Sequence, residues 1–154
     1  MTGTYALTIS PRRGVTRRPR QATGGAWPLA HRPEAAGEAR RITRRLLTWW
    51  GVPQEVADSV LLTVSELVTN AVEHAQPPLN LTLNRDADTR RVHIEVSDGG
   101  PAHREGDWAA SGTPDEHGRG LDIIDHIIDH ITAAHGEHDH PGHVVHWADV
   151  NATA

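Results

Sequence analysis

The chain has 154 residues, with 15 basic and 20 acidic side chains, a formal net charge of −5 and no cysteine. This length predicts one domain, and the lack of cysteine excludes a disulfide scaffold. The negative charge argues against a general nucleic-acid binder, and no apolar run approaches the roughly 18 to 20 residues that a membrane span needs. Since the first 25 residues also lack a signal-peptide hydrophobic stretch, we expect a cytoplasmic protein.

Residues 1–25 are rich in arginine and helix breakers, which predicts a disordered extension before a domain over 26–154. A first amphipathic helix is predicted over 34–50, and Gly51 is suited to end it. Pro53 fits the first turn of a second helix that runs to about Ala75.

Alternating apolar and polar residues predict strands over 79–84 and 92–97, joined as a hairpin. The glycine- and proline-containing segment 101–117 is predicted to be a mobile lid. A third helix is expected from Leu121 to about Ile131, a closing strand over 144–150, and short strands near Trp27 and Ile131. The order of elements indicates an α+β fold, a two-layer sandwich with helices on one face of a mixed, largely antiparallel sheet.

Three separated motifs fit one nucleotide site. The first lies on the second predicted helix, where Glu66, Asn70 and His74 recur at each helical turn and so share one face. A carboxylate, an amide and an imidazole on one face can serve a metal-phosphate group.

The other two motifs are glycine-rich. Asp98 ends a predicted strand and is followed by Gly99, Gly100 and Pro101, where the backbone must turn tightly and can approach a ligand closely. The segment Gly118-Arg119-Gly120-Leu121 precedes the third predicted helix, so its free backbone N–H groups would face an anion. Because the chain contains no lysine, phosphate contacts must come from arginine, histidine or backbone groups.

With these motifs in order, the chain resembles the ATPase superfamily of gyrase, the heat-shock chaperone, histidine kinases and MutL. The resemblance covers about Trp27 to Val150 and is strongest to the small RsbW-like anti-sigma-factor serine kinases. It implies a Bergerat-type ATP-binding fold, ATP with Mg²⁺ as cofactors, and a sigma factor and an anti-sigma-factor antagonist as partners. It also allows a homodimer.

The resemblance implies a role for each motif residue. Asn70 would coordinate Mg²⁺, and Glu66 would orient or deprotonate the attacking hydroxyl. Asp98 would accept a hydrogen bond from the adenine amino group, and Gly100 would let the base approach. Phosphate contacts would come from a set of residues that includes the third motif: His74, Gly118, Arg119, Gly120 and Leu121.

Two segments depart from the family pattern. Pro101 follows Gly100 where many relatives have a further glycine, and Gly142-His143-Val144-Val145 stands where relatives often carry lysine and threonine.

Two other functions stay open. One is an ATP-dependent partner-binding module without turnover. The other is a metal-binding protein, since the chain has 12 histidines, including His126 and His130 one turn apart on the third predicted helix. No defined metal motif matches their spacing.

Overall fold

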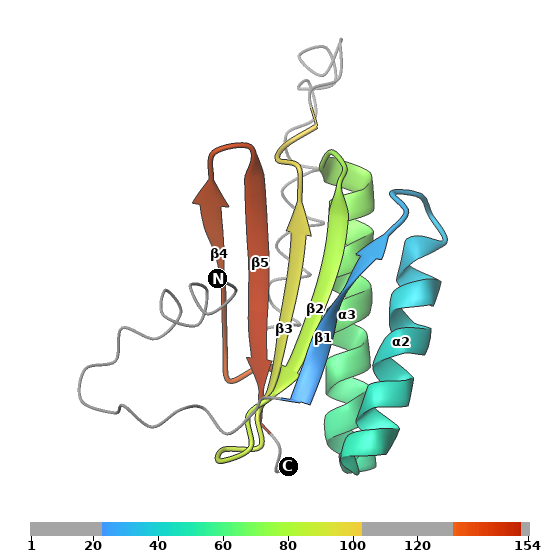
Figure 1. The fold of residues 1–154 in the computed structure, drawn as a ribbon, viewed down its shortest axis with the longest axis vertical. Coiled ribbons are helices and arrows are strands. Elements are labelled where there is room, and N and C mark those ends of the chain that lie inside the picture. The colour runs from blue at the N-terminus through green and yellow to red at the C-terminus, as the bar shows by residue number, and fades with distance from the viewer. Residues whose placement is uncertain (1–22, 103–130, 152–154) are drawn as a thin grey trace, which may run out of the picture.

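The computed structural model describes residues 23–102 and 131–151. Two helices, α2 (Ala35–Trp50) and α3 (Gln54–His74), cover one face of a five-stranded sheet (Figure 1). In chain order the strands are β1 (Thr23–Leu29), β2 (Leu79–Arg85), β3 (Val92–Asp98), β4 (Ala134–His140) and β5 (His143–Val150). This arrangement confirms the predicted α+β sandwich with both described helices on one face of the sheet.

Each helix buries one regular stripe of side chains toward the sheet. Gly51 ends α2 in the left-handed conformation, with φ of 66°, and its N–H donates to the Thr48 carbonyl at 3.1 Å. Pro53 then precedes α3, which packs along α2. The buried residues are Ala35, Ala39, Thr43, Leu47 and Trp50 in α2 and Val56, Ala57, Val60, Thr63, Val64, Leu67, Val68 and Ala71 in α3.

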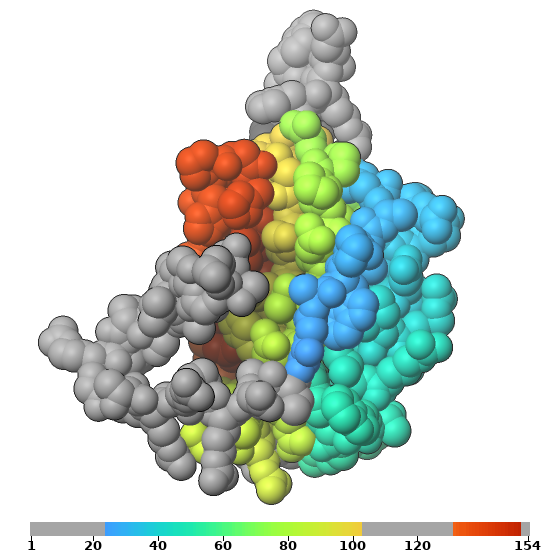
Figure 2. Space-filling view, in the orientation of Figure 1, coloured from blue at the N-terminus to red at the C-terminus, as the bar shows by residue number. Residues whose placement is uncertain are grey.

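The sheet has the order β1-β2-β3-β5-β4, and all four neighbouring pairs among these described strands are antiparallel. Alternation along β2 and β3 turns one set of side chains into the core beneath the helices. That set is Leu79, Leu81, Leu83, Val92, Ile94 and Val96. The opposite side of the sheet, which we call the open face, is turned toward the viewer in Figure 2, with α2 at its border.

The register of the central strands decides which polar residues lie on the helix side. Asp98 is paired with Val144, and His146 is paired with both Val96 and Glu137. Residues directly opposite each other in an antiparallel pair project from the same face. His146 and Glu137 therefore lie on the same side of the sheet as the buried Val96, beneath the helix layer.

The histidine-rich C-terminal segment forms a longer strand than the sequence indicates. The sequence predicts only a short strand near Ile131, whereas β4 runs as far as His140 and pairs with β5 along its length. Pro141 and Gly142 make the connecting turn, and Gly142 has φ of 84°, which a proline-glycine turn requires. Because β4 is polar on both faces, it carries no hydrophobic alternation that would reveal a strand.

The strand expected near Trp27 is β1, and it starts at Thr23, within the segment assigned to the extension. Residues 1–22, most of the predicted lid (103–117) and nearly all of the third helix (121–130) lie outside the described residues.

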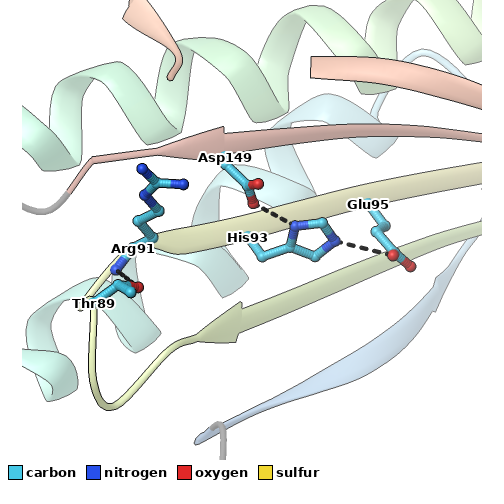
Figure 3. Close-up of polar contacts among 5 residues, drawn as sticks. All are labelled: Thr89, Arg91, His93, Glu95 and Asp149. Atoms are coloured by element: carbon cyan, nitrogen blue, oxygen red, sulfur yellow. Dashed lines mark hydrogen bonds and ion pairs between the residues drawn. The ribbon is translucent and has the colours of Figure 1, made fainter. Parts of the chain in front are cut away.

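His93 links two carboxylates on the open face (Figure 3). Its Nδ1 lies 2.5 Å from Asp149 Oδ1, and its Nε2 lies 3.0 Å from Glu95 Oε1. The Trp147 ring stacks against the imidazole with a centroid distance of 6.2 Å. Burial acts to lower the pKa of His93, but hydrogen bonding and attraction to Asp149 and Glu95 outweigh it and raise the pKa to about 9.

This imidazolium predicts a pH-dependent contribution to stability. A folded-state pKa of about 9 against an ordinary value of 6.5 means that the contribution is complete below pH 6.5 and is lost as the pH rises through about 9. The side chain is 33% exposed, so solvent screening reduces its size to the order of 1 to 2 kcal/mol. The free energy of unfolding, measured with urea, should fall between about pH 6 and about pH 10. This fall should be smaller in His93→Gln than in wild type, because the variant has no imidazolium to lose. Equal losses would contradict a charged His93.

Candidate functional site

Helix α3 carries the first predicted motif on the side that meets the sheet. Asn70 and His74 line a cavity between α3 and strands β3, β4 and β5. The amide oxygen Oδ1 of Asn70 is shielded from solvent and has no hydrogen-bond partner among the described residues. A buried polar atom without a partner is costly, which points to a ligand or an ion that completes this site.

Asp98 lies at the end of β3 and is only 3% exposed. Its Oδ1 accepts a hydrogen bond from the Gly100 N–H at 2.8 Å. Gly100 has φ of 95°, so glycine suits the position. Gly99 meets a different constraint, since a Cβ there would lie 2.1 Å from the Pro77 carbonyl oxygen. The two glycines thus permit the close turn that fixes the Asp98 carboxylate.

Backbone hydrogen bonds join this turn to the C-terminal end of α3. The Gln76 N–H donates to the Gly100 carbonyl at 2.8 Å, and the Ala102 N–H donates to the His74 carbonyl at 3.0 Å. Ala75 and Pro101 also form an isolated antiparallel bridge. These bonds fix the distance between the helix that carries Asn70 and the strand that carries Asp98.

The cavity has a volume of about 230 Å³. Its lining combines carboxylates, imidazoles and one amide with a few small apolar side chains. The lining residues are Asn70, Ala71, His74, Ala75, Asp98, Pro101, Glu137, Asp139, Val144 and His146. This concave surface at the meeting point of four elements, whose exposed atoms are mostly apolar with a few polar groups, is the candidate binding site.

His146 connects two carboxylates of this cavity. Its Nε2 lies 3.3 Å from Asp98 Oδ2, and its Nδ1 lies 3.3 Å from Glu137 Oε2. Sequence reasoning did not assign His146, Glu137 or Asp139 to the site. The proline-glycine turn at 141–142 is the signal that could have placed β4 beside β5 and brought these residues to the cavity.

The predicted site residues fall into three groups. Asn70, His74 and Asp98 meet at the cavity, and Gly100 supports Asp98. Glu66 lies one helical turn before Asn70 and is partly buried, but it is not among the residues that line the cavity. The third motif, Gly118-Arg119-Gly120-Leu121, lies outside the described residues.

The described part of the chain contains no candidate site for the metal-binding alternative. Within residues 23–102 and 131–151, no group of three or more histidine, aspartate or glutamate side chains is arranged to hold a metal ion. His140 and His143 stack on each other with a centroid distance of 4.5 Å at the end of the β4–β5 hairpin. His126 and His130 lie outside the described residues.

Comparison with known protein families identifies the family of the domain. A family model described as histidine kinase-like ATPase domain matches residues 29–146. The chain belongs to the histidine kinase-like ATPase family. The matched range contains all three motifs, so the domain is an ATP-binding domain, and the cavity around Asn70 and Asp98 lies within it.

One solved structure shares the fold of this ATPase domain. The structure of the RsbU and RsbW domains of Rv1364c from Mycobacterium tuberculosis has a TM-score of 0.61 and 18% identity. That match covers 83% of this chain and 32% of the other, so the chain spans about a third of that structure's length. A histidine kinase domain from Erythrobacter litoralis EL346 has a TM-score of 0.49 and 21% identity, over 76% of this chain and 60% of the other.

No curated protein sequence matches the ATPase domain closely enough to count as a relative. Among the described residues, no helix has the length and apolar character to cross a membrane.

The residues present fit a nucleotide with Mg²⁺. Mg²⁺ prefers oxygen ligands and keeps phosphate and water oxygens in its shell. Asn70 offers a shielded amide oxygen without a partner among the described residues. Asp98 offers a carboxylate whose Oδ1 is already fixed by Gly100, at the position expected to read the adenine amino group. The donor set therefore suits ATP with its metal.

Proposed function

We propose that the protein is an ATP-dependent regulatory kinase: it transfers the γ-phosphate of ATP to a serine or threonine of an anti-sigma-factor antagonist and sequesters a sigma factor. The observation that carries the proposal is the meeting of Asn70 and Asp98 in one cavity, with the Asn70 amide oxygen still lacking a partner among the described residues. Membership of the histidine kinase-like ATPase family and the likeness in fold to an RsbW-containing structure support it.

Each residue has a defined task in this proposal. Asp98 binds adenine by accepting a hydrogen bond from its amino group, and Asn70 holds Mg²⁺ through its amide oxygen. Mg²⁺, when bound, neutralises phosphate charge and orients the γ-phosphate. Glu66 accepts the proton of the antagonist's serine or threonine hydroxyl. The oxygen of that hydroxyl bonds to the γ-phosphorus, while the bond between the γ-phosphorus and the ADP oxygen breaks. His74 and the segment Gly118-Arg119-Gly120-Leu121 contact the phosphates.

The proposed function places the protein in the cytoplasm, where sigma factors and their antagonists act, and it allows a homodimer. A second function remains, in which the same domain binds partners in response to ATP without transferring phosphate. The partly buried Glu66 favours that second function in one respect, because it is not among the residues that line the cavity.

Labelled ATP distinguishes the two functions. Purified protein is incubated with γ-labelled ATP, Mg²⁺ and each candidate antagonist, and the label on antagonist serine or threonine is measured. Transfer establishes the kinase. Release or capture of a partner in response to ATP without label on the antagonist establishes the binding module. Absence of any response to ATP would contradict both.

Asn70→Ala tests the metal ligand. We expect Mg²⁺ to enhance the ATP affinity of wild-type protein, and this enhancement to fall about 10- to 100-fold in the variant, because the amide oxygen that holds the ion is missing. Calorimetry with ATP in the presence of Mg²⁺ or of a chelator measures the difference. Asn84→Ala on β2 is the matched control, since Asn84 is not among the residues that line the cavity. An unchanged Mg²⁺ effect in Asn70→Ala would remove Asn70 from the metal site.

A further inference from the structure

Helix α2 turns a row of basic side chains and one tryptophan to the outside of the molecule. Arg41, Arg45 and Trp49 follow one another at every fourth residue, so they lie along one side of the helix. All three are exposed, and the exposed fraction of Trp49 is 74%. Arg44 is also exposed and lies beside them, one helical turn after Arg41. We call these four residues the arginine–tryptophan stripe.

The stripe lies on the outer side of α2. The opposite side of the helix is buried, and α2 packs against α3 and β1. Figure 1 shows α2 at the outer border of the helix layer. The stripe is therefore accessible to another molecule over a length of about 12 Å, which corresponds to the eight-residue step from Arg41 to Trp49.

The arginines of the stripe have no acidic partners among the described residues. Arg40, which lies outside the stripe, donates a hydrogen bond to Ser65 Oγ at 3.2 Å. In the described part of the chain, no ion pair or side-chain hydrogen bond holds Arg41, Arg44 or Arg45. Like charges one helical turn apart destabilise a helix. The stripe thus differs from an ordinary solvated face, where charges of opposite sign support one another.

The residue types of the stripe fit a protein partner. Tryptophan and arginine are enriched at protein interfaces and carry much of the binding energy there. Leu62 on α3 is the only other large apolar side chain that is exposed among the described residues, so Trp49 is not part of a general apolar surface. The net charge of −5 disfavours an extended polyanion such as duplex DNA or an anionic membrane. A single acidic helix is narrow enough to contact the stripe alone.

We propose that the arginine–tryptophan stripe docks an acidic helix of a partner protein. That helix lies along α2, with carboxylates at every fourth residue against Arg41 and Arg45 and an apolar side chain on Trp49. Equal spacing on two neighbouring helices brings several charge pairs together at once, as at the flanks of coiled coils. The inference goes beyond the nucleotide site, and ATP has no part in it.

Two synthetic helical peptides of about four turns test the charge requirement. The glutamate peptide carries glutamate at every fourth residue beside a leucine, and the glutamine peptide carries glutamine at the same positions. Fluorescence anisotropy with the full-length protein and no ATP should show tighter binding of the glutamate peptide, and this binding should weaken as salt is added. Arg41→Glu combined with Arg45→Glu should lower the affinity for the glutamate peptide about 10- to 100-fold, and Trp49→Ala should lower it about 10-fold.

Matched variants separate the stripe from net charge and from exposed apolar surface. Arg90→Glu combined with Arg91→Glu makes the same change of charge in the exposed turn between β2 and β3, and Leu62→Ala removes the other exposed apolar side chain. Both should bind the glutamate peptide like wild type. Arg41→Gln combined with Arg45→Gln should be at least as stable as wild type in thermal unfolding, because it removes a repulsive pair.

The remaining outcomes refute the inference. They include a glutamate peptide that binds no better than the glutamine peptide, an equal loss of affinity in the two double glutamate variants, and a lower thermal midpoint in the double glutamine variant. Tighter binding to vesicles with about one third phosphatidylserine, or to duplex DNA of about 20 base pairs, would assign the stripe to a membrane or a nucleic acid instead. All these measurements are made without nucleotide, so they leave the proposed function to its own test.

Discussion

Replacing Glu66 with alanine is expected to lower the rate of phosphoryl transfer by about 10² to 10⁴ while ATP binds nearly as well as to wild type. The reason is that, in the proposed mechanism, Glu66 acts on the incoming hydroxyl and not on the nucleotide, from a position one turn before Asn70 on α3. Single-turnover transfer to the antagonist, with ATP affinity measured on the same preparation, gives both quantities.

Glu55→Ala is the matched control for this experiment. Glu55 lies exposed in the first turn of the same helix, so its loss changes the charge of α3 without touching the site. We expect transfer and ATP binding to stay near wild type in this variant. If Glu66→Ala transfers phosphate at the wild-type rate, Glu66 has no catalytic role and another group must take the proton.

Asp98→Asn is expected to weaken binding of adenine nucleotides by about 10- to 150-fold, because a charge-assisted hydrogen bond worth roughly 1.5 to 3 kcal/mol is lost. The substitution keeps the size of the side chain, and the amide oxygen can still accept from the Gly100 N–H. Calorimetry with ATP and Mg²⁺ measures the loss, and GTP should compete poorly with ATP for wild-type protein.

Asp58→Asn provides the control for charge, since Asp58 is exposed on α3 and hydrogen-bonds Gln54. It should bind ATP like wild type. An Asp98→Asn variant with wild-type affinity would show that Asp98 does not contact the base, and the cavity would then need another adenine-reading group.

Local sequence patterns predicted most of the architecture because they report directly on burial. The apolar stripes of α2 and α3 and the alternation in β2 and β3 are strong signals, and the structure confirms all four elements. The site was predicted as far as its residues lie on these elements, since the helical spacing of Asn70 and His74 and the position of Asp98 at a strand end fix where they project.

The β4 side of the cavity could not be predicted in the same way. Glu137, Asp139 and His146 reach the site through the pairing of β4 with β5, which is a long-range property set by register. A strand that is polar on both faces shows no hydrophobic period, so residues 135–143 resembled a histidine-rich loop. The proline-glycine turn was the one local clue.

The two outer strands also bear on how the protein behaves at high concentration. A sheet edge with free backbone donors and acceptors can recruit another chain and start aggregation. On β1, Pro28 interrupts the row of backbone donors, and on β4 the side chains Glu137, His138, Asp139 and His140 are all exposed and polar. Neither edge presents the flat apolar strand that edge-to-edge association requires. The polarity that hides β4 from sequence analysis thus also makes this strand, the outer one on its side among the described residues, a poor template for pairing with another chain.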